Sequence, residues 1–382
     1  MSQIIAAIDI GSSAIRVVAG QLREDKIVLL ARASAQSAGV RGGYITNKSE
    51  AYVAIKKAIR LTEKQIGQQI NEVHITAGGG PMATKITSSS VAVSHGDSIV
   101  TEYDIEQAIR RSVKKTLSTN QRNIDSIILQ YKLDGEETVS EPIGMKGKKL
   151  DVQAMLFNYA GQNMDAAEDV LDQIEVEVHD FFPSIIASSI VSLSTIDRKV
   201  GCVLVDIGSD STSYVVYEQD APVHVGYLEI GSDHITQALA LEYQISVSDA
   251  EIVKLNGPLP EGVNKEKVEV TIKKQTIDLF KKINADLKTI EKSGNLPGGA
   301  VLCGAGAMLK DIDIVARDVL KIPTRKATIR AFKRSDPDER ELGWAGVYGL
   351  AIHAMEQERF KHKNILGVVL RKAFSFVRRF SA

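Results

Sequence analysis

The sequence predicts an α/β fold of two similar halves. The phrase Asp9-Ile10-Gly11-Ser12-Ser13 separates two apolar runs, and it returns between two further runs as Asp206-Ile207-Gly208-Ser209-Asp210-Ser211-Thr212. An apolar run, a tight Gly/Ser turn and a second apolar run are typical of a β-hairpin. Each copy precedes a third strand-like segment, at 27–33 and at 223–230. Such turns offer hydroxyls and backbone N–H groups that suit phosphate, so we expect a nucleotide's phosphates to be clamped between the halves.

The composition is that of an ordinary soluble protein. The 382 residues are enough for two domains, and 44% of them are hydrophobic and 25% charged. A net charge of −1 gives no overall attraction to nucleic acid. Cys202 and Cys303 lie in apolar runs, which predicts buried, reduced thiols. We find no signal-peptide pattern and no stretch near the ~20 apolar residues that span a bilayer, so we expect a cytosolic protein.

Beyond the first hairpin, helices and strands alternate. Apolar residues at helical spacing predict a helix over 49–66, and alternation predicts a strand over 73–77 that Gly78-Gly79-Gly80-Pro81 ends. Residues 82–160 then have the pattern of an inserted α+β unit without a phosphate-type turn. Its expected elements are strands over 82–88, 124–133 and 150–158, a polar loop over 134–149, and a helix that starts at Thr101 with Asp104 as capping partner.

The chain then returns to the second hairpin. Asn163 is the expected N-cap of a helix over 164–174, a strand follows at 176–178, and Pro183 lies near the start of a helix through Leu193. The elements expected downstream are helices 232–243 and 249–254 capped by Ser232 and Ser248, an amphipathic helix over 265–292, a buried strand over 300–303, a Gly-rich turn over 304–309, and helices to about 320 and over 341–357.

Three Gly-rich turns after buried strands, at 9–13, 206–212 and 304–309, occur in order with the segment Ala250-Glu251-Ile252-Val253-Lys254 between the last two. This order resembles the actin-like ATPase superfamily, whose fold is a ribonuclease H-like unit duplicated into two domains. In that superfamily two acidic hairpins contact phosphates and metal, a third Gly turn cradles the adenosine, and an Ala-Glu-x-x-Lys helix holds ribose and base. The resemblance implies ATP and Mg²⁺ as cofactors.

Within the superfamily, the chain resembles the bacterial cell-division family FtsA over nearly its whole length. The resemblance rests on the segments 39–45, 246–251 and 341–346, and on 82–160, which occupies the place of that family's special subdomain. It implies this division of the chain: subdomain 1A from 1–81 and 161–195, inserted subdomain 1C from 82–160, subdomain 2A from 196–232 and 298–358, subdomain 2B from 233–297, and a short linker with an amphipathic membrane-targeting helix from 359–382.

Carried over residue by residue, the resemblance implies that Asp9 and Asp206 are the catalytic residues and hold the waters of Mg²⁺. Arg16 is the cation nearest to the first turn and is a further candidate for nucleotide binding. The other implied nucleotide-binding residues are Gly11, Ser12, Ser13, Gly208, Ser209 and Thr212 around the phosphates, Gly304, Gly306 and Met308 on the adenine side, and Glu251 and Lys254 at ribose and base.

The sequence departs from the superfamily pattern at the turns themselves. Ser209 and Asp210 stand where the second hairpin usually has more glycine, and Asp210 adds a negative charge near the expected phosphates. Ala14 stands where a lysine often follows the first Ser/Thr pair, and the third turn reads Cys-Gly-Ala-Gly. Because these changes affect catalysis more than binding, we expect at most slow ATP hydrolysis. The alternative is a degenerate pocket with a structural role.

The C-terminal stretch 364–380 has the pattern of an amphipathic helix that lies in the plane of a membrane. From Arg359 to the end the chain has seven Lys/Arg residues and no acid. On a helical wheel the apolar residues fill one half and the basic residues the other, and only Val368 breaks the pattern. The expected membrane-binding residues are Leu366, Val369, Leu370, Arg371, Lys372, Phe374, Phe376, Val377, Arg378, Arg379 and Phe380. We expect about five residues of linker before this helix.

Three functions remain open at this point. The leading one, implied by the resemblance, is a peripheral protein on the cytoplasmic face of the cell membrane at midcell. It would bind ATP, self-assemble into actin-like filaments, contact anionic lipids and other division proteins, and hold the FtsZ ring through the FtsZ C-terminal peptide. The basic helix 265–292 is a plausible surface for that acidic peptide. The second is a pilus-assembly adaptor resembling PilM, and the third a sugar kinase, for which no carboxylate base beside a sugar pocket is marked.

Overall fold

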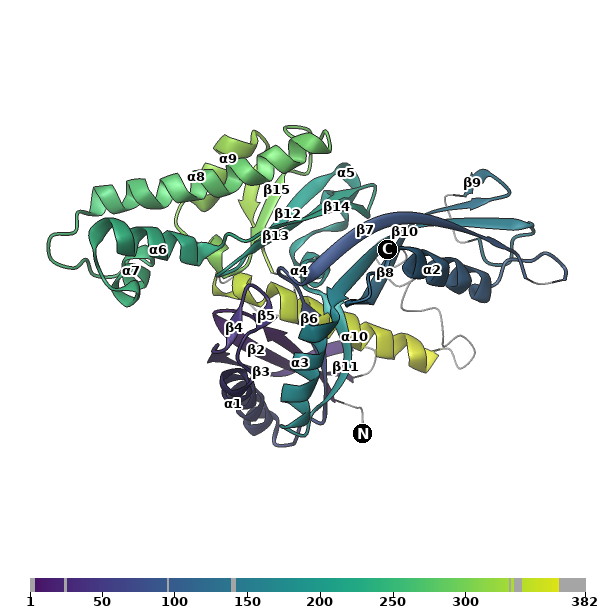
Figure 1. Cartoon of the computed structure of the whole chain (residues 1–382), viewed down its shortest axis with the longest axis horizontal. Helices are drawn as coiled ribbons and strands as arrows, with labels where there is room; N and C mark the ends of the chain where they lie inside the picture. Colours follow the sequence, from purple (N-terminus) through teal and green to yellow (C-terminus); the bar gives the residue numbers. More distant parts are fainter. Residues whose placement is uncertain are drawn as a thin grey trace.

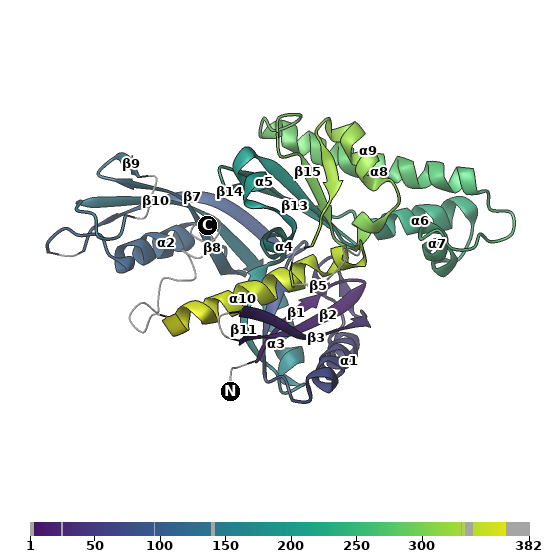
Figure 2. The same ribbon diagram turned by 180° about the vertical axis from the view of Figure 1, so that it is seen from behind.

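The computed structural model describes residues 4–23, 26–94, 96–138, 142–329, 331–332 and 339–363. Two five-stranded sheets form the two halves, ordered β11-β6-β1-β2-β3 and β14-β13-β12-β15-β16 (Figures 1 and 2). In each sheet three antiparallel strands are followed by two parallel ones, so the predicted duplication is confirmed. The strands are β1 Ile4–Ile10, β2 Ala14–Arg23, β3 Lys26–Gln36, β6 Glu72–Ala77, β11 Glu177–Pro183, β12 Cys202–Ile207, β13 Thr212–Glu218, β14 Ala221–Leu228, β15 Ala300–Cys303 and β16 Thr324–Lys326.

Helices cover the outer face of each sheet. On the first sheet these are α1, Lys48–Ile66, and α3, Gly161–Asp172, which share one apolar core with β1, β2 and β6. The second sheet is covered by α6 Ser232–Tyr243, α7 Val247–Lys254, α8 Lys265–Thr289 and α9 Ile312–Leu320. The expected helix 49–66 is present, and Gly67 ends it in the left-handed region with φ of 73°.

Two helices lie between the sheets and join the halves. The core around α4, Ser184–Ser192, and α10, Ala345–Lys363, takes side chains from both sheets, including Val18 and Leu204. Figure 1 shows α10 running along this junction. Cys202 and Cys303 belong to the same core and are free, fully buried thiols, as predicted.

An α+β unit projects from the first half beside β11 (Figure 1). Its sheet has the order β7-β10-β8-β9, with α2, Glu102–Thr116, packed on it. The strands are β7 Met82–Ala92, β8 Gln121–Leu133, β9 Glu136–Thr138 and β10 Lys149–Ala160. The predicted capping pair is confirmed, since the Thr101 N–H donates to Asp104 Oδ2 at 2.8 Å.

Several expected boundaries are wrong, because tertiary contacts decide them. Asn163 lies inside α3 rather than capping it, and its side-chain oxygen accepts a hydrogen bond from the Ile45 N–H at 3.0 Å. Ser246, not Ser248, caps α7, because Ser246 Oγ accepts from the Asp249 N–H at 3.0 Å and also donates to that side chain. Gly231 holds the N-cap position expected of Ser232.

Short elements and the last helix also differ from expectation. The strand β9 lies inside the expected polar loop, β11 is longer than the expected 176–178, and α5, Thr195–Val200, and β16 were not predicted. A 3₁₀ turn, η2, occupies Glu339–Trp344 and delays the start of α10 to Ala345. That helix continues to Lys363, through residues expected as a linker, because no glycine or proline interrupts the segment.

Candidate functional site

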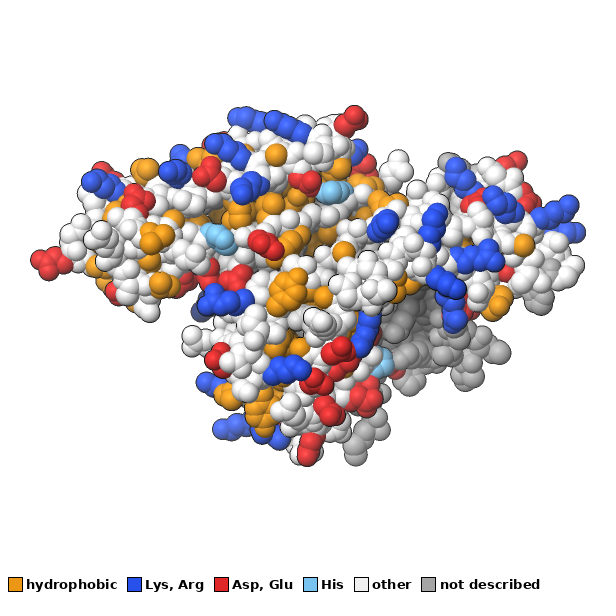
Figure 3. Space-filling view, viewed as in Figure 1, with side chains coloured by type: hydrophobic (Ala, Val, Ile, Leu, Met, Phe, Trp, Pro, Cys, Tyr) orange, Lys and Arg blue, Asp and Glu red, His pale blue; other side chains and the backbone are white. Residues whose placement is uncertain are grey.

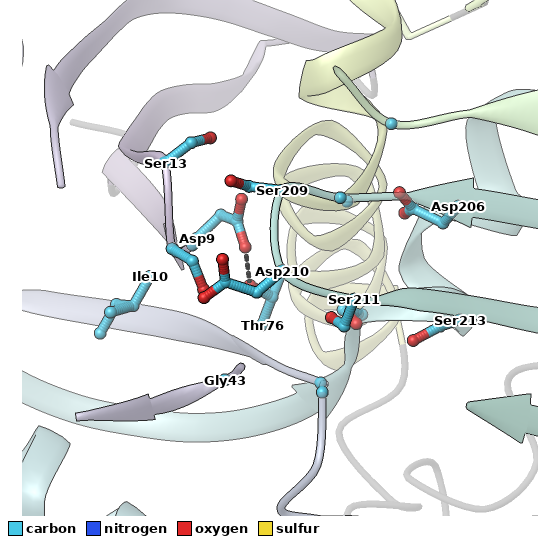
Figure 4. Close-up of a pocket in the computed structure, with 18 of the residues that line it drawn as sticks. Asp9, Ile10, Ser13, Gly43, Thr76, Asp206, Ser209, Asp210, Ser211 and Ser213 are labelled. Atoms are coloured by element: carbon cyan, nitrogen blue, oxygen red, sulfur yellow. Dashed lines mark hydrogen bonds between the residues drawn. The ribbon is translucent and has the colours of Figure 1, made fainter. Parts of the chain in front are cut away.

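A cavity of about 160 Å³ opens between the two halves, and both acidic turns line it. Figure 4 shows their labelled side chains around one space. The residues that line it include Asp9, Gly11, Ser12, Ser13 and Arg16 from the first half and Asp206, Gly208, Ser209, Asp210, Ser211 and Gly304 from the second. Asp9 and Asp206, almost 200 positions apart in the sequence, therefore line one cavity, because the equivalent hairpins of the two sheets face each other.

Asp9 is held at the end of β1 by two neighbours. Thr76 Oγ1, on the parallel strand β6, donates to Asp9 Oδ1 at 2.7 Å, a bond drawn in Figure 4. Arg16, paired with Asp9 across the β1–β2 hairpin, places Nη1 at 3.5 Å from Asp9 Oδ2. The cation nearest to the first turn thus faces the cleft, in the absence of a lysine at position 14.

Asp206 occupies the equivalent place on β12. Ser188 Oγ, from the central helix α4, donates to Asp206 Oδ2 at 2.6 Å, and Cys303 on the adjacent strand β15 is a second hydrogen-bonding neighbour. Burial raises the pKa of Asp206, and the negative charge of Asp9 raises it further, whereas Ser188 and Arg16 lower it. Two carboxylates with oxygen-rich surroundings are a donor set that suits Mg²⁺ with bound waters, so these residues fit the implied metal.

The second turn also contacts the first half directly. Asp210 Oδ2 accepts a hydrogen bond from the Gly42 N–H at 2.9 Å, between β4 (Val40–Arg41) and β5 (Tyr44–Ile45). Tyr227 on β14 interacts with the Ser211 side chain and the Gly80 backbone. Burial raises the pKa of the Tyr227 hydroxyl, and these two hydrogen bonds partly offset that rise.

Five of the expected nucleotide-binding residues do not line this cavity. Thr212 is fully buried, and its hydroxyl donates to the Ile230 carbonyl at 2.7 Å, which closes the hairpin. Gly306 packs on Ile207. Met308 lies in a separate surface hollow beside Lys310. The other two, Glu251 and Lys254, are described next.

Glu251 and Lys254 lie in the second half, where they contact α6 and each other. Lys254 Nζ donates to Thr236 Oγ1 at 2.8 Å and lies 2.6 Å from Glu251 Oε2. Thr236 Oγ1 is also 2.6 Å from Glu251 Oε2, and neither Glu251 nor Lys254 lines the cavity. The two residues expected at ribose and base therefore contact α6 and each other rather than the cavity that the acidic turns line.

Sequence reasoning missed the residues that orient the two acids. Thr76 and Ser188 come from a strand and a helix remote in sequence, and neither belongs to a Gly-rich turn. A third missed feature is Arg32 on β3, whose Nη1 lies 2.7 Å from both carboxylate oxygens of Glu341 and whose guanidinium stacks 4.8 Å from the Trp344 ring. This group fixes η2, whose last residues border the cavity at Leu342 and Gly343.

The expected membrane-binding residues, from Leu366 to Phe380, lie outside the described residues. In the part of the chain that the structure describes, no helix is both long enough and apolar enough to cross a bilayer.

Two family models match the chain. The model for the cell division protein FtsA matches residues 203–341, and the model for the SHS2 domain inserted in FtsA matches residues 82–157. The second of these coincides with the α+β unit that projects from the first half. The two matches together include the second acidic turn and the inserted sheet.

Curated relatives align with this chain over most of its length. The cell division protein FtsA of Bacillus subtilis (strain 168) is 23% identical over 357 residues, which covers 88% of this chain and 81% of that protein. FtsA of Borreliella burgdorferi is 21% identical over 393 residues, covering 97% of this chain and 95% of that protein.

Solved structures share the fold. A chain of the PilM–PilN type IV pilus biogenesis complex superposes with a TM-score of 0.71 at 16% identity, covering 92% of this chain and 98% of that one. MreB 5 of Spiroplasma citri bound to AMPPNP gives 0.55 at 12% identity, covering 95% and 100%. These likenesses confirm the predicted two-domain actin-like fold. The family models and the curated relatives identify the chain as a member of the FtsA family of actin-like cell-division proteins.

Proposed function

We propose that the chain binds ATP with Mg²⁺ in the cleft, self-assembles, and tethers the FtsZ ring to the cytoplasmic face of the cell membrane at midcell. The observation that carries the nucleotide part is the meeting of Asp9 and Asp206, each at the end of an equivalent strand, on one cavity lined by Gly/Ser turns. The AMPPNP-bound MreB 5 structure, which has the same fold, supports the choice of an adenine nucleotide.

In this proposal the two acids hold the metal's water shell. The raised pKa of Asp206, caused by burial and by the charge of Asp9, means that ionising both acids is costly without a cation between them. Mg²⁺ would supply charge neutralisation for these carboxylates and for the phosphates. The hydroxyls of Ser12, Ser13 and Ser209 and the Arg16 guanidinium are the groups of this chain available to the phosphates.

A nucleotide titration tests the assignment. We expect Asp206→Ala to weaken Mg²⁺-dependent binding of a fluorescent ATP analogue at least tenfold, because one of the two metal-facing carboxylates is lost. Asp278→Ala is the matched control, since Asp278 lies on α8 with half of its side chain exposed, far from the cavity lining. Equal affinity of wild type and Asp206→Ala would overturn the phosphate and metal assignment.

Hydrolysis is proposed to be slow at most. The carboxylate of Asp210 lines the cavity and brings a third negative charge to the side where phosphates would lie. A like charge at that place opposes the negatively charged transition state of phosphoryl transfer. Nucleotide would then act chiefly on shape and assembly. A phosphate-release assay with the purified chain tests this, and turnover faster than about 1 per second would contradict it.

The proposed surface for the FtsZ C-terminal peptide is on the second half, over α6–α8. Four lysines of α8 are exposed there, Lys273, Lys274, Lys281 and Lys282. In Figure 3, basic side chains follow the length of this helix. Large apolar side chains are also exposed on this part of the second half: Leu241 on α6 is 81% exposed, and Leu255, directly after α7, is 60% exposed. Exposed apolar area beside positive charge suits a peptide that carries both apolar and acidic residues.

A pull-down with an FtsZ tail peptide tests this part. We expect capture of the wild type and loss with Lys273→Glu/Lys274→Glu, because charge reversal repels an acidic peptide. The matched control is Lys114→Glu/Lys115→Glu on α2, where both lysines are equally exposed. If neither wild type nor control is captured, the FtsZ part of the proposal fails.

A PilM-like adaptor is the second candidate, and one observation favours it: the TM-score of 0.71 with the chain from the PilM–PilN complex. The same pull-down with a peptide from a PilN-type partner separates the two roles. Capture of that peptide and not of the FtsZ tail would replace the division role. A sugar kinase is the third, and sugar-dependent ADP release would be its sign.

A further inference from the structure

Two histidines and two carboxylates gather at the edge of the first sheet, outside the residues that line the cleft cavity. They are Glu72 and His74 on β6 and His179 and Asp180 on the edge strand β11. Candidate ligand atoms of His74, His179 and Asp180 all lie within 4.8 Å of one another. The two imidazole rings are 4.4 Å apart between centroids and inclined at 49°.

A β-bulge brings this cluster together. In the parallel pairing of β11 with β6, Val178 lies opposite Val73 and Asp180 opposite His74, so His179 is an extra residue. In an unbroken strand the consecutive residues His179 and Asp180 would point to opposite faces. The bulge changes the direction of one of them, and both contribute to the cluster.

One histidine is oriented by a carboxylate outside the proposed ligand set, and the other lies directly beside Asp180. His74 Nδ1 lies 2.7 Å from Asp180 Oδ1, and His179 Nδ1 lies 2.7 Å from Glu72 Oε1. His74 Nδ1 and Asp180 Oδ1 are close enough to bind one ion together, in place of the proton between them. A carboxylate accepts from a proton-bearing nitrogen, so His179 has its proton on Nδ1 and its lone pair on Nε2. Histidines that bind metals are usually held in this way, with one nitrogen on a carboxylate and the other on the ion.

The site is partly enclosed and electrostatically suited to a cation. The side chains of His74 and Asp180 are 10% and 16% exposed, whereas His179 and Glu72 are 29% and 38% exposed, so one side is open for entry. Exposed acids on and after the neighbouring helix α3 add negative charge, and Figure 3 shows acidic side chains gathered over α3 and β11. Such a potential concentrates cations locally. These acids are Asp172, Glu175 and Glu177.

We propose that this cluster binds a divalent transition metal, with Zn²⁺ as the best match, through His74, His179 and Asp180. Two imidazoles and a carboxylate are a donor set typical of Zn²⁺, whereas Mg²⁺ and Ca²⁺ prefer oxygen alone. Glu72 is a positioning residue that holds the ring of His179 for the metal. A water completes the four-coordinate set.

The cluster shares the strand β6 with a residue that contacts the cleft. His74 is two residues before Thr76 on β6, so both side chains lie on the same face of the sheet. Thr76 donates to Asp9 at 2.7 Å. An ion bound at His74 therefore braces the strand that orients one of the two cleft acids.

A zinc titration of the full, tag-free chain tests the site, using competition with a chromophoric chelator. We expect one tight Zn²⁺ per wild-type chain, a loss of that site in His179→Ala, and binding weakened about 10–100-fold in Glu72→Gln. His224→Ala is the matched control, because His224 is also partly exposed and lies 2.6 Å from a carboxylate, Asp286, but belongs to no such cluster among the residues that the structure describes.

X-ray absorption on the one-to-one zinc complex gives an independent reading of the ligands. We expect imidazole nitrogen in the first shell at about 2.0 Å. Unchanged stoichiometry and affinity in both His179→Ala and Glu72→Gln would overturn the proposal. So would a wild-type chain that binds Zn²⁺ no more tightly than His179→Ala. The Glu72→Gln variant keeps the test valid even if a histidine variant fails to fold.

Discussion

Asp210 and Gly42 join the two halves of the molecule by a hydrogen bond of 2.9 Å from the Gly42 N–H to Asp210 Oδ2. Asp210 belongs to the second acidic turn and replaces a residue that is usually glycine in the superfamily. Tyr227 makes a second contact across the cleft, at Gly80. Asp210, the residue at which this turn departs from the superfamily pattern, is thus hydrogen-bonded to the opposite half.

We predict that Asp210→Asn binds ATP more tightly than the wild type. The amide oxygen of asparagine still accepts the Gly42 hydrogen bond, so the change removes only the charge that faces the phosphates. We expect a gain of about tenfold, which corresponds to roughly 1.4 kcal/mol. Nucleotide titration measures it, with Asp278→Asn as the control for a loss of negative charge elsewhere. Weaker binding would show instead that Asp210 takes part in holding the metal.

We predict that Asp206→Asn is more heat-stable than the wild type without nucleotide. Because burial and Asp9 raise the pKa of Asp206 in the folded state, the folded chain binds its proton more tightly than the unfolded chain does. Wild-type stability therefore falls as the pH rises from about 3.9 through the raised pKa, and the variant lacks this fall. We expect a Tm higher by about 2–4 °C at pH 7.

Differential scanning calorimetry between pH 4 and pH 7 checks this prediction. The Tm difference between Asp206→Asn and the wild type should grow with pH, and Asp278→Asn should show no such trend. Mg²⁺-ATP should narrow the difference, since the bound ion favours the ionised acid of the wild type. A variant that is less stable at every pH would contradict the assigned cost of the buried charge.

We predict that Arg32→Ala destabilises the protein by about 1–3 kcal/mol. Glu341 is only 9% exposed and accepts hydrogen bonds from Arg32 and Tyr348. Arg32→Lys should recover only part of the loss, because a lysine lacks the planar guanidinium that stacks on Trp344. Urea denaturation measures the loss. The control Arg60→Ala breaks an exposed pair with Glu63 and should cost under about 0.5 kcal/mol.

We predict that a chain cut after Lys363 loses binding to anionic liposomes. The cut leaves α10 complete and removes the amphipathic stretch 364–382. A finer test compares Phe376→Ser, on the apolar half of the wheel, with Val368→Ser, the apolar residue among the basic ones. A buried Phe contributes about 1.5–3 kcal/mol, so Phe376→Ser should weaken partitioning by about 10–100-fold. Equal co-sedimentation of both variants would contradict an in-plane helix.

The duplicated architecture could be predicted because its signals are local. Each acidic turn follows an apolar strand and precedes another, and this pattern alone implies two hairpins of the same kind. The pairing of Thr101 with Asp104 was predictable for the same reason, since capping depends on residues three apart. The meeting of Asp9 and Asp206 on one cavity follows from the repeat.

The remaining features depend on contacts between segments far apart in the sequence. Asn163 reads as a helix cap, but its amide is taken by the backbone of Ile45 and Gly43, so α3 starts earlier. Glu251 and Lys254 match a ribose-binding pattern, yet in this structure both contact Thr236 on α6. A local sequence pattern does not indicate which of two polar partners a side chain contacts, because the second partner belongs to an element that is distant in the sequence.

The helix α10 gives the molecule a lever arm. Its first turn lies against the cleft, where Gly346 packs near Thr76 and Ser188, the two residues that hold Asp9 and Asp206. Its nineteen residues make a rod about 28 Å long, and its other end, at Lys363, is where the amphipathic stretch begins. A tilt of about 5° at the cleft would move that end by about 2.5 Å, so a change in the cleft too small to separate the halves would still shift the start of the stretch proposed to bind a membrane.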